Sequence, residues 1–215
     1  MKLLDLFCGG GGASVGYARA GFEVFGVDIS WRHKYPFDRI KADALEVLDD
    51  EKFISQFDVI HASPPCQAFS PVRNLQLAQG RTYARPDLIG PVREKLIRWG
   101  GIYVIENVPS APMTGIILCG SSFGLKVRRH RRFESNIQLE TLPCRHKEQG
   151  RPVGIYGSMR DNLPKGGRTA VSIEEAQEAM GIDWLGWLSL KEAIPPIYTE
   201  HLGKQIAAQI KNPPD

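Results

Sequence analysis

The chain has 215 residues, a formal net charge of +3 and a hydrophobic content of 42%. This is the size of one full domain with a small appendage, and the composition is ordinary for a globular protein. The small net charge excludes a protein that is basic over its whole surface, and no apolar run approaches the ~20 residues of a transmembrane helix. The apolar stretch at the N-terminus is too short for a secretory signal, so we expect a cytoplasmic protein that does not enter a membrane.

The cysteines of the chain show no paired spacing, which indicates free thiols in a reducing compartment. Cys144 and His146 are close in the sequence, but two candidate ligands do not make a zinc site, and we expect no bound metal. The cysteines are Cys8, Cys66, Cys119 and Cys144.

Apolar runs and helical patterns alternate along the first half of the chain. Residues 2–7 form an apolar run that ends at a glycine cluster, and residues 13–22 follow with small and apolar side chains at helical spacing. The alternation predicts an α/β fold, with a mostly parallel sheet and helices on both of its faces. Further strands are expected at 23–29, 57–62 and 101–108, and further helices at 42–48 and 87–100.

The second half of the chain begins with a different kind of segment. Residues 134–168 contain several prolines and glycines and no sustained period, which is typical of an inserted element. Residues 172–181 begin with a capping box, Ser172 with Glu175, and end at a glycine, so they predict a helix. Residues 189–210 predict two helical pieces separated by a Pro-Pro pair. We therefore divide the chain into a core at 1–133, a recognition element at 134–168 and a C-terminal segment at 169–215 that returns to the core.

A glycine-rich turn, 5-DLFCGGGG-12, lies between the first predicted strand and the first predicted helix. Glycines allow a ligand to approach the backbone closely, and a helix N-terminus offers free N–H groups. Asp28 ends the second predicted strand, where an acidic side chain accepts hydrogen bonds from ribose hydroxyls, and Asp43 could accept one from an adenine amino group. The spacing is not that of a dinucleotide fingerprint, so the pattern favours an adenosyl ligand, and S-adenosylmethionine fits. The plainer alternative is that the glycines only form a tight turn.

A second stretch, 63-SPPCQAFS-70, places a cysteine directly behind two prolines. Proline fixes its own φ angle and restricts the residue before it, so Cys66 follows a stiff, extended entry at the end of a buried strand. A thiol in that position is either a nucleophile or a small buried hydrophobic group. The residues of this stretch alone leave both possibilities open.

In this order, the stretches 5-DLFCGGGG-12, 64-PPCQAFS-70, 105-IENV-108 and 129-RHR-131 closely resemble the DNA (cytosine-5)-methyltransferase family. Weaker similarity continues in 172-SIEEAQEAMGI-182 and 194-IPP-196, so the resemblance covers most of the chain except 134–168. It implies a Rossmann-like methyltransferase fold. It also implies transfer of a methyl group from S-adenosylmethionine to carbon 5 of cytosine in DNA.

The resemblance also implies roles for single residues. Cys66 would add to carbon 6 of cytosine, because carbon 5 accepts a methyl group only once the ring has become an enamine. Glu106 would be the acid at N3, and Arg129 and Arg131 would bind the cytosine O2 and favour the thiolate of Cys66. The implied cofactor-binding residues are Phe7, Gly9, Gly11, Asp28, Asp43 and Pro65, and the implied substrate-binding residues are Ser63, Pro64, Gln67 and Asn107.

The partner implied by the family is DNA with one cytosine flipped out of the duplex, since its carbon 5 and carbon 6 cannot be reached in the stack. The segment that follows Cys66 would close over this base. We expect a monomer of a bacterium or phage, in a restriction–modification or self-protection role. Three alternatives stay open: the same chemistry on RNA, the same chemistry on a free cytosine nucleotide, and a non-catalytic binding protein with this fold.

The chain departs from the family pattern at three places. Val127 replaces a glutamine two residues before the first arginine of the Arg-x-Arg motif, and Glu192 stands near the place of a C-terminal asparagine. The target-recognition region is reduced to 134–168, which can hold only a few base-reading side chains. We therefore expect short or relaxed sequence specificity, or a partner that supplies it. The candidate base-reading residues are Arg145, His146, Lys147, Arg151, Arg160, Lys165 and Arg168.

Overall fold

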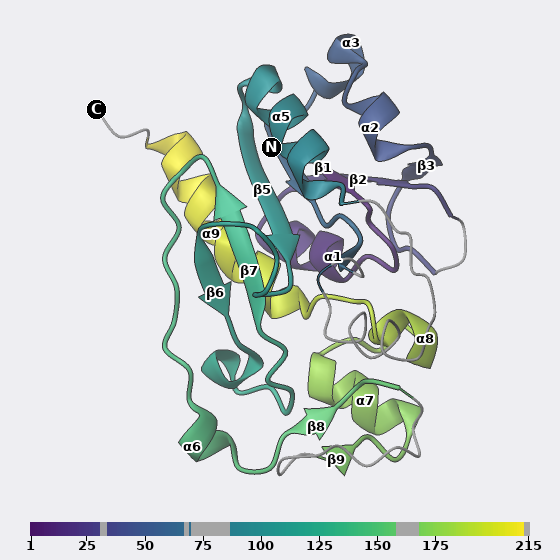
Figure 1. Cartoon of the computed structure of the whole chain (residues 1–215), viewed down its shortest axis with the longest axis vertical. Coiled ribbons are helices and arrows are strands. Elements are labelled where there is room, and N and C mark those ends of the chain that lie inside the picture. The colour runs from purple at the N-terminus through teal and green to yellow at the C-terminus, as the bar shows by residue number, and fades with distance from the viewer. Residues whose placement is uncertain (31–33, 67–68, 70–86, 158–167, 213–215) are drawn as a thin grey trace.

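The computed structural model describes residues 1–30, 34–66, 69, 87–157 and 168–212. Its centre is a seven-stranded sheet with the order β3-β2-β1-β4-β5-β7-β6, and helices cover both faces (Figure 1). The predicted α/β class is therefore confirmed. The strands of this sheet are β1 (Lys2–Leu6), β2 (Glu23–Asp28), β3 (Arg39–Lys41), β4 (Val59–Ala62), β5 (Ile102–Asn107), β6 (Ile116–Leu118) and β7 (Arg131–Ser135).

The sheet is mostly parallel, as predicted. Strands β1 to β5 pair with one another in parallel register, whereas β7 runs antiparallel to both β5 and β6. The carboxyl ends of β1 to β5 consequently lie along one edge. In open α/β sheets, ligands bind at this edge, in the crevice outside the strand ends.

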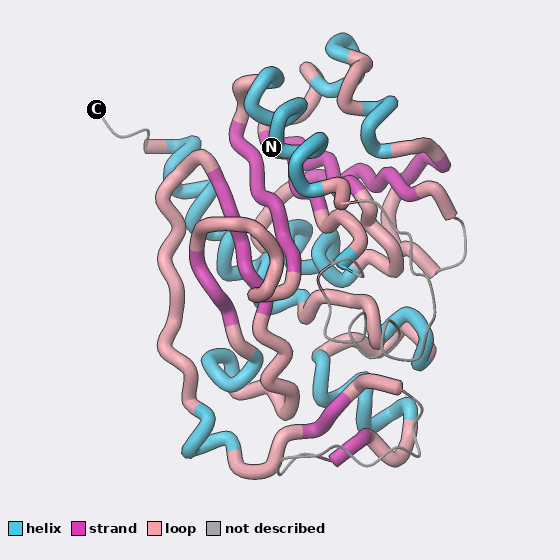
Figure 2. The backbone as a smooth tube through the Cα atoms, viewed as in Figure 1, coloured by secondary structure: helices cyan, strands magenta, loops and turns pink. Residues whose placement is uncertain are grey.

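Side chains alternate between the two faces of the sheet because successive residues of a strand point in opposite directions. In β1, Leu3 packs into a cluster with residues of α1 and α9, and Leu4 packs into a separate cluster with residues of α2 and α5. Both faces of β1 are thus buried, as is typical of central parallel strands. The helices, seen as cyan coils in Figure 2, are α1 (Gly12–Arg19) and α9 (Pro196–Lys211) on one face, and α2 (Ala44–Val47), α3 (Glu51–Ile54) and α5 (Ile89–Trp99) on the other.

A smaller region lies beyond the ends of β6 and β7, at the opposite end of the molecule from α3 (Figure 1). It has its own buried cluster, which includes Val127, Ile155 and Met180. The boundary with the core sheet differs slightly from the predicted one, because β7 continues to Ser135, inside the segment 134–168. The elements of the smaller region are η2 (Gly120–Phe123), α6 (His146–Gln149), β8 (Val153–Gly154), β9 (Arg168–Thr169), α7 (Ile173–Met180) and α8 (Trp187–Leu190).

The predicted signals at the ends of the C-terminal helices are confirmed. The Glu175 backbone N–H donates to Ser172 Oγ over 3.2 Å, which caps α7, and Gly181 ends that helix with φ 66°. Pro196 is the first residue of α9, where its missing N–H costs nothing. None of the helices in the described part of the chain has the length and apolarity that a membrane crossing requires.

Candidate active site

The residues singled out by their sequence context meet at the carboxyl edge of the sheet. The turn from Ser63 to Cys66 follows β4, and Glu106 and Asn107 end the neighbouring strand β5. Two elements far apart in the sequence are thus joined by one strand pairing. The cofactor-side candidates lie on the same edge: Phe7, Gly9 and Gly11 follow β1, Asp28 ends β2 and Asp43 follows β3.

The cysteine turn is fixed from both sides. Asn107 Nδ2 donates to the Pro64 carbonyl oxygen over 2.9 Å, and the Val108 N–H donates to Asn107 Oδ1 over 2.9 Å. The Ser63 N–H donates to the Leu6 carbonyl, which continues the sheet pairing beyond β4. Asn107 therefore holds the strand end of β5 against the turn that carries Cys66. The side chain of Cys66 is half-buried and forms no disulfide.

Glu106 is a buried carboxyl group beside an arginine. Its side chain is 7% exposed, and Arg131 Nε lies 2.9 Å from Glu106 Oε1. The contact is an ion pair without hydrogen-bond geometry. The buried Oε1 atom therefore has no hydrogen-bond partner among the described residues. Burial raises the pKa of Glu106, while Arg131, a hydrogen bond with Ser63, and Arg129 act in the opposite direction. A buried oxygen without a hydrogen-bond partner points to a ligand that forms the missing hydrogen bond.

The electrostatic environment of Cys66 contains the same residues. Burial raises the pKa of its thiol, and the charge of Glu106 acts in the same sense. Arg131 and Arg129 act against burial by favouring the thiolate. Burial outweighs the arginines, so the pKa of Cys66 is raised in the free protein.

Arg129 is hydrogen-bonded to the C-terminal segment. It is 4% exposed, and its Nε donates to the Ala193 carbonyl over 2.8 Å, while Nη2 donates to the Lys191 carbonyl. Its backbone has φ 37°, a conformation rare for residues other than glycine. Burial lowers the pKa of Arg129 to about 10, which still leaves it charged at neutral pH. Two of its five donors thus bind the C-terminal segment, a contact that no local pattern encodes.

Two further buried residues extend the polar network behind Ser63. His61 Nε2 lies 2.9 Å from Ser63 Oγ, and His61 Nδ1 lies 3.0 Å from the Tyr17 hydroxyl. Burial lowers the pKa of His61 to about 3, so the ring is neutral and has one donor and one acceptor nitrogen. The sequence analysis missed both residues. The only available signal was a histidine among the apolar residues Val59, Ile60 and Ala62.

On the cofactor side, the turn after β1 is held by Asp28. Its Oδ2 accepts from the Gly9 N–H over 2.9 Å, and its Oδ1 accepts from the Ser30 N–H over 2.8 Å. Phe7 and Gly9 have φ angles of 60° and 51°. The Cα of Gly9 faces open space, whereas Gly11 packs closely against Tyr35 and Pro36. The glycines thus have separate roles: Gly9 leaves the backbone accessible, and Gly11 permits packing.

Among the remaining predicted site residues, the structure describes Asp43 and Pro65 but not Gln67. Asp43 is exposed and caps α2, with Oδ1 accepting from the Leu45 N–H over 2.7 Å. This capping bond uses only one of its two carboxylate oxygens. Pro65 is half-buried within the cysteine turn. Gln67 and most of the segment expected to close over the substrate lie outside the described residues.

The prediction of no metal was based on Cys144 and His146 alone. The structure brings two more potential ligands, Cys119 and His130, to the same place. They come from the end of β6 and from the residue before β7, so sequence spacing could not reveal the group.

The fold belongs to a class shared with solved methyltransferases. A protein encoded within an Escherichia coli prophage, provisionally named a DNA modification methyltransferase, superposes with a TM-score of 0.66 at 16% identity, over 99% of this chain and 100% of that one. DNMT2 from Spodoptera frugiperda, solved as a mutant, superposes with a TM-score of 0.61 at 14% identity, over 94% and 98% of the two chains. At these identities the likeness concerns the fold.

The family follows from the sequence comparison. Residues 1–109 match the family model of the C-5 cytosine-specific DNA methylases, and the chain belongs to this family. The Type II methyltransferase M.HgiGI of Herpetosiphon aurantiacus is 30% identical over 127 residues, which are 54% of this chain and 97% of that sequence.

Other relatives are considerably longer than the part that matches. M.AgeI of Thalassovita gelatinovora is 32% identical over 84 residues, 33% of this chain and 20% of its own length. M.HindV of Haemophilus influenzae is 29% identical over 129 residues, 54% of this chain and 40% of its own length. The chain therefore matches between a fifth and two fifths of these two Type II methyltransferases.

Proposed function

We propose that the protein transfers a methyl group from S-adenosylmethionine to carbon 5 of cytosine in DNA, through a covalent adduct between Cys66 and carbon 6. The observation that carries the proposal is Glu106, a buried carboxyl group with an oxygen that lacks a hydrogen-bond partner among the described residues. This group ends the strand next to the rigid turn that carries the half-buried Cys66 thiol.

The two groups divide the chemistry between them. The Cys66 thiolate forms a bond to carbon 6, and the electron pair of the ring double bond moves so that carbon 5 becomes nucleophilic. Negative charge would otherwise build toward N3, and a protonated Glu106 can donate there. The raised pKa of Glu106 keeps a larger fraction of the carboxyl groups protonated at neutral pH than in water. Once carbon 5 carries the transferred methyl group, loss of its proton to a base such as water lets the ring double bond re-form and Cys66 leave as thiolate.

The arginines prepare this site in different ways. Arg131 lies beside Glu106 and favours the Cys66 thiolate by its charge, so it can stabilise negative charge at either group. Arg129 favours the thiolate as well, but its hydrogen bonds hold the C-terminal segment near Lys191 and Ala193. We assign contact with the base to Arg131 and a positioning role to Arg129.

The carboxyl edge of β1 to β3 fits an adenosyl ligand. Its features are an accessible backbone at Gly9, an aromatic ring at Phe7 and carboxylates at Asp28 and Asp43. Each oxygen of Asp28 accepts one backbone N–H and keeps a second lone pair for a ribose hydroxyl. S-adenosylmethionine supplies an electrophilic methyl group on a sulfonium when bound there. The residues of this chain bind and orient it toward Cys66.

The substrate assignment to DNA rests on the family and on relatives that are named Type II methyltransferases. A cytosine must leave the duplex to reach Cys66, at a cost of a few kcal/mol for unstacking. We place the protein, as a monomer, in a bacterial or phage restriction–modification setting. Several basic residues predicted to read DNA are at the surface, including Arg145, Lys147 and Arg151.

The direct test is incubation with S-adenosylmethionine carrying a tritiated methyl group, together with duplex DNA, tRNA or dCMP. We expect label in DNA, and none with the Cys66→Ala variant. DNA that contains 5-fluorocytosine should form a covalent adduct with the wild-type protein only. Label in DNA that persists in Cys66→Ala would overturn the mechanism, and label only in tRNA or dCMP would overturn the substrate.

A further inference from the structure

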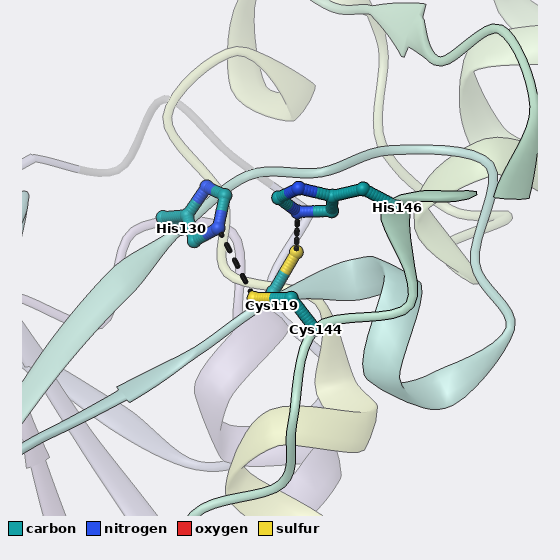
Figure 3. Close-up of side chains that lie close together, drawn as sticks. All are labelled: Cys119, His130, Cys144 and His146. Carbon is teal, nitrogen blue, oxygen red and sulfur yellow. Dashed lines mark hydrogen bonds between the residues drawn. The ribbon is translucent and has the colours of Figure 1, made fainter. Parts of the chain in front are cut away.

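Four potential metal ligands converge below the ends of β6 and β7. One ligand atom from each of Cys119, His130, Cys144 and His146 lies within 4.8 Å of all the others. Figure 3 shows each sulfur atom facing one imidazole ring, Cys119 facing His146 and Cys144 facing His130. The residues come from three segments: the end of β6, the turn into β7, and the loop that enters α6.

Two of the distances between ligand atoms are close to those in a tetrahedral zinc site. Cys119 Sγ lies 3.2 Å from His146 Nε2, and Cys144 Sγ lies 3.5 Å from His130 Nε2 (Figure 3). Two sulfurs and two nitrogens bound to one zinc ion lie about 3.3–3.8 Å from one another, given the usual Zn–S and Zn–N bond lengths. All four ligand atoms lie within 4.8 Å of one another, so shifts of about 1 Å or less at each atom reach that arrangement. Two thiolates with two imidazoles are also a common ligand set of structural zinc sites.

The surroundings of the ligands support a built site. Ser121 Oγ lies 3.1 Å from Cys119 Sγ and accepts the Arg145 N–H over 3.0 Å, which ties the loop carrying Cys144 to η2. Ser122 Oγ donates to the Pro143 carbonyl over 2.9 Å in the same loop. Hydrogen bonds of this kind orient ligands around metal ions.

Two plainer arrangements are weaker explanations of this group. A disulfide between Cys119 and Cys144 would leave two histidines facing sulfur with no role. Two separate thiol–imidazole hydrogen bonds would not require the two pairs to share one centre, with the rings of His130 and His146 only 5.2 Å apart. A single cation accounts for the convergence of all four side chains.

We propose that Cys119, His130, Cys144 and His146 bind one structural Zn²⁺ ion. Four protein ligands leave no open position, so the ion would hold the fold and not take part in a reaction. Because His130 stands between Arg129 and Arg131, the ion would also fix the turn that presents both arginines. Each binding event would release the thiol protons of the two cysteines as the thiolates form.

The test is the zinc content of the purified chain after removal of any affinity tag, measured by mass spectrometry of the metal. We expect about one zinc ion per chain in the wild type. The variants Cys144→Ser and His146→Asn should lose it, and both positions are accessible enough for the chain to fold without the ion. The matched controls are Cys66→Ala and His201→Asn, which change a cysteine and a histidine outside the group and should keep the ion.

Two further readouts separate zinc from the alternatives. Replacement of zinc by Co²⁺ should give the visible absorption of a tetrahedral cobalt–thiolate centre in the wild type and not in Cys144→Ser. A chelator should lower the melting temperature of the wild type and of Cys66→Ala, but not that of Cys144→Ser. A wild type that takes up no zinc under reducing conditions would overturn the proposal. So would a disulfide between Cys119 and Cys144, or zinc retained in both ligand variants.

Discussion

At Cys66, burial and charge act in opposite directions on one thiol. The pKa is raised above its ordinary value of 9.0, so in the free protein the thiol form dominates at neutral pH. In the proposed mechanism, substrate binding completes the activation by placing an electrophilic carbon against the sulfur. Storing the cysteine as a thiol also limits side reactions of an otherwise reactive group.

The pH dependence of Cys66 alkylation tests this balance. We expect alkylation of the free protein by iodoacetamide to rise about tenfold per pH unit from pH 7 to beyond pH 9, because only the thiolate reacts. In Arg131→Met the rise should continue to higher pH, since a charge that favours the thiolate is gone. The extent of reaction at Cys66 is measured by peptide mass spectrometry. Rapid alkylation that is independent of pH between 7 and 9 would contradict the raised pKa.

The role of Glu106 as an acid makes a second prediction. Glu106→Gln should lower the rate of methyl transfer by about 10²–10⁴-fold, because the amide cannot give a proton to N3. Glu134→Gln is a matched control. Glu134 is also buried and also pairs with an arginine, Arg93, but it lies on β7 and not on β5. That variant should lose stability and keep its rate per folded molecule. Equal rates in Glu106→Gln and wild type would exclude the acid role.

Single residues show where sequence analysis reaches its limit. The positions of Cys66 and Glu106 follow from strand ends, which local patterns predict. The contact of Arg129 with Ala193 spans 64 residues, and the pairing of His61 with Tyr17 spans 44. Such contacts depend on how helices pack on the sheet, so no motif contains them.

At the scale of elements, helices α1 and α9 approach each other closely at Gly16. A Cβ added to Gly16 would lie far inside van der Waals contact of the Pro196 carbonyl oxygen and the Thr199 hydroxyl. Thr199 Oγ1 also donates to the Ala13 carbonyl over 2.8 Å, so the two helices are hydrogen-bonded where they touch. The packing of α9 against α1 therefore requires a glycine at position 16.

A glycine-to-alanine pair tests this approach. Gly16→Ala should destabilise the protein by about 1–3 kcal/mol or more, since the backbone atoms it meets cannot rotate away. Gly90→Ala, in the first turn of α5, meets nothing within 4 Å apart from its chain neighbours. Its gain in helix propensity is opposed by the restriction that Pro91 places on the preceding residue, so it should change the stability by less than about 1 kcal/mol. Urea denaturation of both variants gives the two free-energy differences. A Gly16→Ala variant that loses no more stability than Gly90→Ala would show that the approach of α9 does not require glycine at position 16.

Most elements of the fold could be predicted from the sequence, and their ends only approximately. The Ser172 cap and the Pro-Pro break mark their helices correctly because they are local signals. Strand β7 and the short strands β3, β6, β8 and β9 were missed. The two or three residues of the short strands carry no detectable period. The group of Cys119, His130, Cys144 and His146 was missed because its members come together only when β6 pairs with β7.

At the scale of the whole molecule, one strand order gathers the candidate chemistry. Five parallel strands end at one edge, so cofactor-side and substrate-side residues that lie up to about 100 positions apart face a common crevice. The smaller region with α7 and α8 reaches this edge through Leu185 and Trp184, whose indole N–H donates to the Gly10 carbonyl over 2.8 Å. The C-terminal segment thereby supports the glycine turn from outside the sheet.

The same arrangement buries one carboxyl group beneath the glycine turn, which couples overall stability to pH. Asp5 is fully buried; it accepts a hydrogen bond from Ser14, and its other oxygen has no hydrogen-bond partner among the described residues. Burial raises the pKa of Asp5 from 3.8 to about 7. The folded state thus binds a proton that the unfolded state has already released between these two values, so the contribution to stability is complete below pH 3.8 and is lost as the pH rises to about 7.

The prediction is that Asp5→Asn reduces the loss of stability between pH 5 and pH 8. A shift of this size corresponds to at most about 4 kcal/mol across the full range, and the asparagine has no proton to lose. Asp38→Asn, at an exposed position, is the control and should follow the wild-type profile. Melting temperatures at a series of pH values measure all three proteins. Parallel profiles for wild type and Asp5→Asn would mean that Asp5 is already ionised in the folded protein at pH 5, and that Ser14 outweighs burial in setting its charge.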